Sequence, residues 1–178
     1  IFLVLFFLGG PLYKFIFFFL VLMISFDIAV FAMDNNDLRE VHKDIFFIAK
    51  VADPEKTFDI VPAEPTKVLT ALKNAVDILF DKSPYTARAI KKLQKKGKIL
   101  IVYDPNHPRL NLAKLVIASF LPDYYQENTN MKTFVVVLGR YGGKWPARDL
   151  ASIIAHELSG HGIQHMERRL KNTRMIDL

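Results

Sequence analysis

The sequence contains no cysteine among its 178 residues, which excludes every site that depends on sulfur ligands or thiol chemistry. Disulfide scaffolds, thiolate zinc fingers, iron–sulfur clusters and cysteine nucleophiles are ruled out. Polar low-complexity tracts are also missing, and with 51% hydrophobic residues the chain has enough apolar side chains to bury a core. Any metal in this protein must therefore be held by His, Asp or Glu.

Charged residues are scarce in the first 32 positions, which carry only Lys14 and Asp27. Residues 15–26 form a nearly unbroken apolar run, and Ala32 ends a short segment that suits signal peptidase. A basic residue followed by a short apolar run and such an ending is typical of a secretory signal peptide. We therefore interpret residues 1–32 as a signal peptide that is cleaved near Ala32.

A retained membrane anchor is the alternative for the same segment. Spanning a bilayer needs about 20 apolar residues, and the run reaches that length only by burying Asp27, at a cost of about 2.5–3.5 kcal/mol. Both interpretations predict an exported domain, either periplasmic or secreted, or held at the membrane through residues 15–32. Because the chain begins with Ile1 rather than Met, we expect its start to be mis-set or truncated and residues 1–12 to be untranslated.

The net charge of +6 belongs to residues 33–178, because Lys14 and Asp27 cancel. Such a surplus favours anionic surfaces only weakly. The densest basic run, between Lys91 and Lys98, contains no aromatic residue, whereas nucleic-acid interfaces combine basic with aromatic side chains. We interpret this run as a solvated helix end and predict no nucleic-acid partner.

Hydrophobic periodicity and turn residues predict a single α+β domain over residues 33–178, with a small sheet packed on helices. The expected helices are one that begins at Thr66, one that runs from Ser83 to about Gly97, and a last one from about Pro146 to Arg169. Strands are expected at 98–103 and 133–138. Residues 37–51 and 112–121 are each compatible with a helix or a strand. The predicted order is therefore helices, then strands, then one final helix.

Three of the five histidines, His156, His161 and His165, lie within ten residues. A zinc hydrolase needs neutral imidazoles as ligands, a carboxylate that accepts a proton from water, and an open coordination position. His156, Glu157 and His161 resemble the H-E-x-x-H pattern of such enzymes, with one residue added. In a regular helix, five steps turn the second ring about 140° away from the first.

A π-bulge can absorb one extra residue in a helix. Two sets of apolar residues flank the motif: Leu150, Ile154 and Leu158 before it, and Ile163, Met166 and Leu170 after it. The second set lies on the same helix face as the first only if one residue between them adds no net rotation about the helix axis. The same delay places His156 and His161 about 40° apart. We therefore predict an irregular helix between Leu158 and Gly162, either bulged at Gly160 and Gly162 or interrupted there and restarted.

The hexapeptide HELSGH, residues 156–161, resembles the HELLGH zinc motif of the dipeptidyl peptidase III metallopeptidases. By this resemblance, His156 and His161 are zinc ligands and Glu157 is the general base that activates water. The resemblance covers only these six residues. It implies a zincin-type active-site helix and hence a zincin-like fold, but not the peptide specificity of that family.

In that family the third zinc ligand is a Glu on a later helix, and this chain offers no obvious equivalent. His165 lies about 12 Å along the helix axis from His156, Glu167 is also too far along, and Asp177 comes one residue before the end. We therefore expect the domain to be truncated and its third ligand to lie in a C-terminal extension past Leu178.

The remaining candidate side chains have ordinary interpretations. His42 and His107 are interpreted as surface residues, and His165 as a surface residue or as a hydrogen-bond partner of the site. Arg140 and Tyr141 precede the last helix and could polarise a substrate carbonyl. We interpret both as flexible surface groups without a role.

The sequence thus predicts an exported zinc metallopeptidase or metallohydrolase that acts on a peptide or protein substrate. Strand 133–138 is expected to align an extended peptide by edge pairing. A non-catalytic envelope binding domain with a structural metal or none is the alternative, and a membrane-tethered interaction protein is a third candidate. The oligomeric state stays open.

Overall fold

The computed structural model describes residues 37–108, 116–124 and 132–167. The chain clusters into two compact units, Ile1–Asn35 and Asn36–Leu178. The first unit, with the signal peptide or anchor predicted at residues 1–32, lies outside the described residues, so the fold given below is that of the second. None of the described helices is long and apolar enough to cross a membrane.

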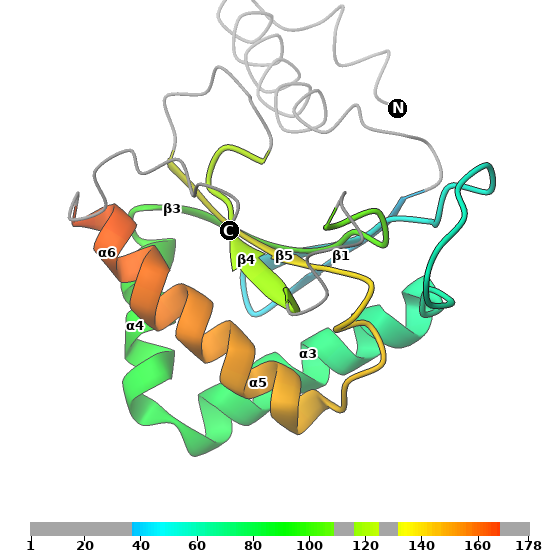
Figure 1. The fold of residues 1–178 in the computed structure, drawn as a ribbon. Coiled ribbons are helices and arrows are strands. Elements are labelled where there is room, and N and C mark those ends of the chain that lie inside the picture. The colour runs from blue at the N-terminus through cyan, green and yellow to red at the C-terminus, as the bar shows by residue number, and fades with distance from the viewer. Residues whose placement is uncertain (1–36, 109–115, 125–131, 168–178) are drawn as a thin grey trace, which may run out of the picture. The chain divides into compact units, whose positions relative to one another are not determined.

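A mixed sheet of five strands, in the order β1-β2-β3-β5-β4, forms the centre of this unit (Figure 1). The strands are β1 (Leu38–His42), β2 (Ile45–Ala49), β3 (Gly97–Tyr103), β4 (Ala118–Phe120) and β5 (Lys132–Leu138). β2, β3 and β5 run parallel, and the edge strands β1 and β4 are antiparallel to their neighbours. We call the end where the three parallel strands finish, and where β1 and β4 begin, the carboxyl end of the sheet.

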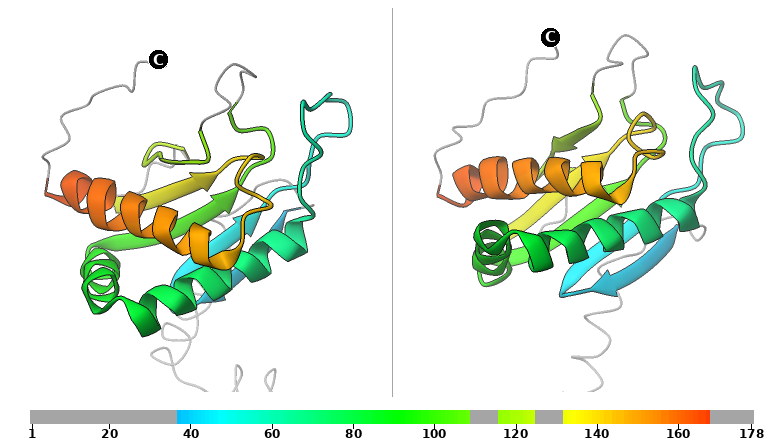
Figure 2. Two further views of the ribbon diagram at one scale, coloured as in Figure 1. Left: turned by 60° about the horizontal axis from the view of Figure 1, so that its bottom comes forward. Right: turned by 90° about the horizontal axis from the view of Figure 1, so that it is seen from below.

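The described helices all lie on one face of the sheet (Figure 2). They are α3 (Pro65–Lys82), α4 (Pro84–Gln94), α5 (Ala147–Ala155), the π-helix η1 (His156–Gly162) and α6 (Ile163–Met166). The core lies between the two layers, where the apolar stripe of α3 meets alternate residues of the strands, such as Ile99, Ile101 and Tyr103 of β3. This architecture confirms the predicted α+β class, with a small sheet packed on helices.

Local capping explains where the first two helices begin. The carboxylate of Glu64 accepts a hydrogen bond from the N–H of Thr66, and Pro65 occupies the first turn of α3. Ser83 accepts a hydrogen bond from the N–H of Thr86, and Pro84 opens α4. Both arrangements satisfy donors that a helix start leaves free. Both helices were predicted with their starts within one residue of those observed.

The predicted order of elements is wrong at its beginning, because residues 37–51 form the hairpin β1–β2 ahead of the helices. Gly97 opens β3 rather than ending a helix. Of the predicted element at 112–121, only Ala118–Phe120 is a strand, and residues 109–115 lie outside the described residues. The strand predicted at 133–138 is confirmed as β5.

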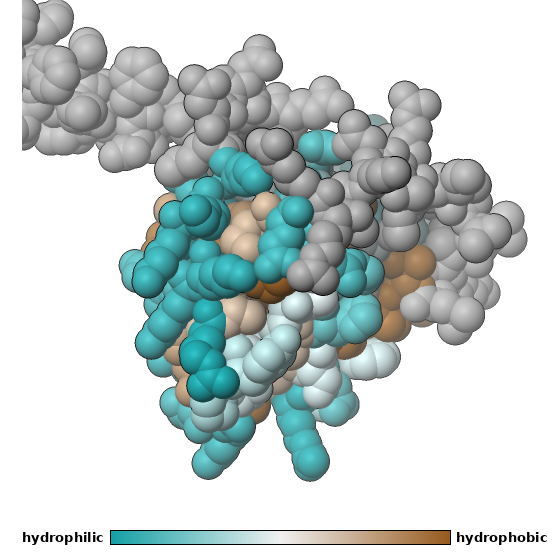
Figure 3. Space-filling view, turned by 90° about the vertical axis from the view of Figure 1, so that its left-hand side faces the viewer, coloured by the Kyte–Doolittle hydropathy of each residue, from teal (hydrophilic) through white to brown (hydrophobic). Residues whose placement is uncertain are grey.

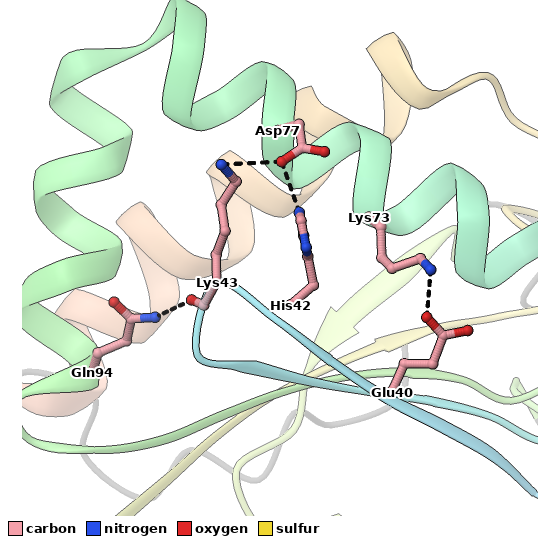
Figure 4. A network of polar contacts seen from close by, with 6 residues as sticks. All are labelled: Glu40, His42, Lys43, Lys73, Asp77 and Gln94. Atoms are coloured by element: carbon pink, nitrogen blue, oxygen red, sulfur yellow. Dashed lines mark hydrogen bonds and ion pairs between the residues drawn. The ribbon is translucent and has the colours of Figure 1, made fainter.

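A two-residue turn at Lys43 and Asp44 closes the β1–β2 hairpin. Both residues have positive φ, 49° and 56°, the conformation that tight hairpin turns require. The Nε2 of Gln94, at the end of α4, donates a hydrogen bond to the carbonyl of Lys43 at 2.7 Å (Figure 4). This bond fixes the turn against α4.

The same hairpin is tied to α3 through Asp77 (Figure 4). The Oδ1 of Asp77 lies 2.7 Å from the Nε2 of His42 and 3.2 Å from the Nζ of Lys43. The hydrogen bond to His42 lowers the pKa of Asp77, with further lowering from Lys43, against a smaller opposing effect of burial. A second ion pair, between Lys73 and Glu40, holds the middle of β1 to α3.

Replacing Asp77 by Asn should cost less than about 1 kcal/mol near neutral pH, the range of partly exposed ion pairs. Because the pKa of Asp77 is lowered in the folded protein, its contribution is present above the unfolded pKa and is lost as pH falls through the folded value. Urea unfolding of both proteins should therefore show a difference at neutral pH that disappears in acid. A difference that persists in acid would mean that packing, not charge, is responsible.

Candidate metal centre

The HELSGH segment forms a π-helix. η1 covers His156–Gly162 and joins α5 to α6 without interruption of the helical path. The predicted irregularity between Leu158 and Gly162 is confirmed, and it begins two residues earlier than expected. Of the two predicted forms, the bulged helix is the one observed.

The π-helix restores the apolar face, as the sequence pattern required. Leu150, Ile154 and Leu158 are at most 2% exposed, and Ile163 and Met166 pack against the same core. A regular helix would have turned the last two to the opposite side. Core packing and the position of His161 therefore depend on the same extra residue.

The two glycines of this segment differ in what they do. A Cβ on Gly162 would lie 3.1 Å from Leu93 and 3.6 Å from the ring of Phe120, so this glycine lets η1 approach α4 and β4 closely. A Cβ on Gly160 would meet nothing within 4 Å. No described glycine has a positive φ. The helix therefore needs a glycine at position 162 because neighbouring side chains leave little room for a Cβ there. It does not need the special backbone conformations that glycine allows at either position.

His156, Glu157 and His161 are brought together by η1. One donor atom from each lies within 4.8 Å of the other two. The two imidazole rings are nearly perpendicular, at 83°, with centroids 5.0 Å apart. His156 is exposed and His161 is half-buried, so the group opens toward solvent. Two imidazoles and a carboxylate at this spacing match the donors that zinc and similar metals take. No other His, Asp or Glu of the described ranges joins the group.

Glu157 is the buried member of this group, with 8% of its surface exposed. Burial raises its pKa above the usual value, while positive charge on His161 and His156 and a hydrogen bond from the backbone N–H of Phe120 oppose that rise. A carboxylate with a raised pKa is a better proton acceptor. Its environment therefore suits the role of a general base.

β4 supplies the edge of the described sheet next to η1. The N–H of Leu121 bonds to the carbonyl of Val135, and the N–H of Gly139 bonds to the carbonyl of Ile117, both at 2.9 Å. In an antiparallel pair, the backbone N–H and C=O groups of every second residue point toward the partner strand and those of the others point away. The N–H and C=O groups of Ala118 and Phe120 therefore point away from β5. The outward N–H of Phe120 is the one that reaches Glu157.

The prediction that strand 133–138 aligns a substrate by its edge is wrong. β5 is paired with β3 along its whole length and with β4 at Val136–Leu138, and the N–H of Leu121 bonds to the carbonyl of Val135. Other strand residues of the described chain therefore already occupy both sides of β5 from Val135 to Leu138. Sequence reasoning missed β4 as the strand beside η1 because it has only three residues and falls inside a stretch that was also compatible with a helix. The order of strands is set by long-range pairing, which the local pattern does not contain.

His165 is not a member of the metal group, and its ring lies against the sheet. Its ring lies 5.7 Å from that of Phe120 and 6.2 Å from that of Phe134. Burial lowers its pKa, as does the charge of Lys132, with an opposing effect of Asp123. It is therefore a packing residue. Glu167 pairs with Lys92 at 3.1 Å.

Arg140 is not the flexible surface group that was predicted. It is 2% exposed, its Nε donates to the carboxylate of Asp59 at 2.8 Å, and another nitrogen donates to the carbonyl of Pro108. Tyr141 donates its hydroxyl hydrogen to the same carboxylate. These bonds fasten segment 50–64 to the loop after β5, so both residues have a structural role away from the metal group. His42 bonds to Asp77, as described above, and Asp177 lies outside the described residues.

Comparison with known proteins adds no assignment, since no family model, no curated protein and no solved structure matches the chain.

Proposed function

We propose that this protein is a zinc-dependent metallopeptidase with a zincin-like arrangement of sheet and active-site helix. The observation that carries the proposal is the convergence of His156, Glu157 and His161 within 4.8 Å on a helix whose extra residue is absorbed as a π-helix. The resemblance of HELSGH to the HELLGH motif supports the same roles. His156 and His161 are the ligands, and Glu157 is the base.

The chemistry divides between the metal and the chain. Bound zinc would polarise the scissile carbonyl and lower the pKa of water at the site. Glu157 takes the proton from that water and passes it to the leaving amine. Its buried carboxylate, held by the N–H of Phe120, is kept in place for this transfer. The third protein ligand that catalytic zinc sites usually have is expected outside the described residues.

β4 aligns the substrate in this proposal. The N–H and carbonyl of Ala118 and the carbonyl of Phe120 face away from β5, next to the helix that carries the base. An extended peptide can pair with these groups as an added strand. The scissile bond would then lie beside Glu157.

Zinc binding tests the assignment of the ligands. In the chain together with any coding sequence that follows Leu178, replacing His156 or His161 by Ala should abolish stoichiometric zinc, because the site falls short of its usual three protein ligands. His42→Ala, which removes an imidazole bonded to Asp77, is the matched control and should bind zinc normally. Metal analysis after dialysis is the measurement. Undiminished zinc in a folded double variant of His156 and His161 would overturn the assignment.

Hydrolysis of a mixed peptide library separates the peptidase from its alternative. An exported binding domain with a structural metal would retain zinc and cleave nothing. No observation favours that alternative over the peptidase, because His156 is exposed and the group is open to solvent. Export, by cleavage near Ala32 or with residues 15–32 kept as an anchor, remains part of the proposal.

A further inference from the structure

The backbone of β4 presents a defined set of hydrogen-bonding groups at the edge of the described sheet. Ser119 and Leu121 direct their N–H and C=O groups toward β5, so those of Ala118 and Phe120 point outward. Both groups of Ala118 and the C=O of Phe120 bond to no other backbone group in the described part of the chain. One donor and two acceptors are therefore available to an added strand.

The fourth outward group, the N–H of Phe120, is already used. It donates to the carboxylate of Glu157, and η1, which carries this carboxylate, packs against β4. In an added strand the same N–H would donate to a carbonyl of the peptide. The Glu157 carboxylate therefore occupies the place of that carbonyl oxygen. The peptide carbonyl opposite Phe120 is displaced from the edge and lies beside the base.

The three remaining groups suit a peptide that runs antiparallel to β4. Ala118 exchanges two hydrogen bonds with one residue of such a peptide, and the next residue to pair lies two positions away, opposite Phe120. That residue donates its N–H to the C=O of Phe120, and its own carbonyl is the displaced one. Because the two chains run in opposite directions, the residue opposite Ala118 is the second one after the displaced carbonyl.

On the basis of the proposed peptidase function, we propose that the cleaved bond directly follows the residue opposite Phe120, and that the second residue after this bond must carry a backbone N–H. The substrates are extended peptides with at least two residues after the cleaved bond. Proline and N-alkylated residues are excluded at the second of these positions, because they cannot donate to the C=O of Ala118.

The part of the peptide before the cleaved bond runs toward the amino end of the sheet, since β4 itself ends there. Figure 3 shows mostly hydrophilic side chains on this face of the described unit. The sequence places a run of lysines between the end of α4 and the start of β3 at the same end: Lys91, Lys92, Lys95, Lys96 and Lys98. A peptide that extends past Phe120 is left in solvent by such a surface. The backbone bonds at Ala118 and Phe120 then determine the register.

A scan of N-methylated peptides tests this register. The Glu157→Gln chain, with any coding sequence that follows Leu178 and loaded with zinc, is used to select the tightest binder from a library of fluorescein-labelled hexapeptides. Each residue of that peptide is then N-methylated in turn, and binding is measured by fluorescence anisotropy. Two positions, two residues apart, should each weaken binding about tenfold or more, because each loses a hydrogen bond to β4. The residue between them is the control, since its N–H points away from β4.

Ala118→Pro tests the strand itself. Proline is tolerated on an edge strand where the N–H faces outward, so the variant should fold, as urea unfolding will show. It removes the donor to the second residue after the cleaved bond and should weaken binding of the unmodified peptide about tenfold. Val41→Pro is the matched control on the other edge strand. His42 and Ile45 flank the two-residue turn and pair with each other, so the N–H of Val41 also faces outward. This variant should bind normally.

The wild-type chain should cleave the unmodified peptide directly after the first of the two sensitive residues. Cleavage at another bond, or equal binding of all the N-methylated peptides, would overturn the register and leave the peptidase function standing. The expected binding pattern without any cleavage would uphold the pairing with β4 and refute the peptidase function. A chain that neither binds nor cleaves any peptide of the library would refute both.

Discussion

Replacing Glu157 by Gln should lower peptide hydrolysis by about 10²–10⁴-fold, the usual cost of losing a general base. The amide has the size of the carboxylate and can still accept the hydrogen bond from the N–H of Phe120, but it cannot take a proton from water. Both imidazoles remain in place, so zinc should stay bound. The measurement is kcat/KM on a peptide selected from the library, together with the zinc content of the same sample.

Glu167→Gln is the control for this prediction. Glu167 follows α6 and pairs with Lys92 at the surface, so its loss should leave hydrolysis unchanged. Wild-type rates for Glu157→Gln would show that Glu157 is not the base. Loss of zinc from that variant would instead show that its carboxylate is a ligand, which the 4.8 Å separation of the three donors also allows.

The elements that sequence reasoning predicted well are those with local signals. Proline at the first turn and a side-chain cap define the starts of α3 and α4 without reference to the rest of the fold. The hairpin at residues 37–51 stayed undecided because its signal, a turn at Lys43 and Asp44, uses residues without the usual Asn-Gly pattern. Its stability comes from Gln94 and Asp77, which are distant in the sequence.

The candidate site was predictable for a similar reason, since its three side chains lie within six residues and their spacing could be compared with the apolar pattern of the same helix. What surrounds them could not be predicted. The hydrogen bond from Phe120 to Glu157 depends on the position of β4, and the burial of Arg140 depends on Asp59, 81 residues earlier. Contacts of this kind follow from the tertiary arrangement alone.

Deletion of Ser159 should be tolerated, which is unusual for a deletion inside a buried helix. It would shorten the motif to H-E-x-x-H, so that the two histidines lie about 40° apart on a regular α-helix. Ile163 and Met166 would keep the phase that packs them against the core. The hydroxyl of Ser159 is also buried without a hydrogen-bond partner among the described residues, and removing such a group avoids a cost of about 1–3 kcal/mol. We therefore expect zinc stoichiometry to be retained and unfolding in urea to occur at an equal or higher concentration.

Insertion of one alanine after Ser159 should have the opposite and larger effect. The π-helix already absorbs one extra residue, and a second would turn everything after it by about 100°. The His161 ring would then no longer lie beside the His156 ring. Ile163 and Met166 would turn out of the core, and each would lose part of the roughly 1.5–3 kcal/mol that burying such a side chain contributes. Zinc should be lost and the urea midpoint should fall sharply. The opposite result, in which the insertion is tolerated and the deletion is not, would mean that η1 does not arise from one extra residue in an α-helix. Core packing and the geometry of the metal site would then not depend on the same residue.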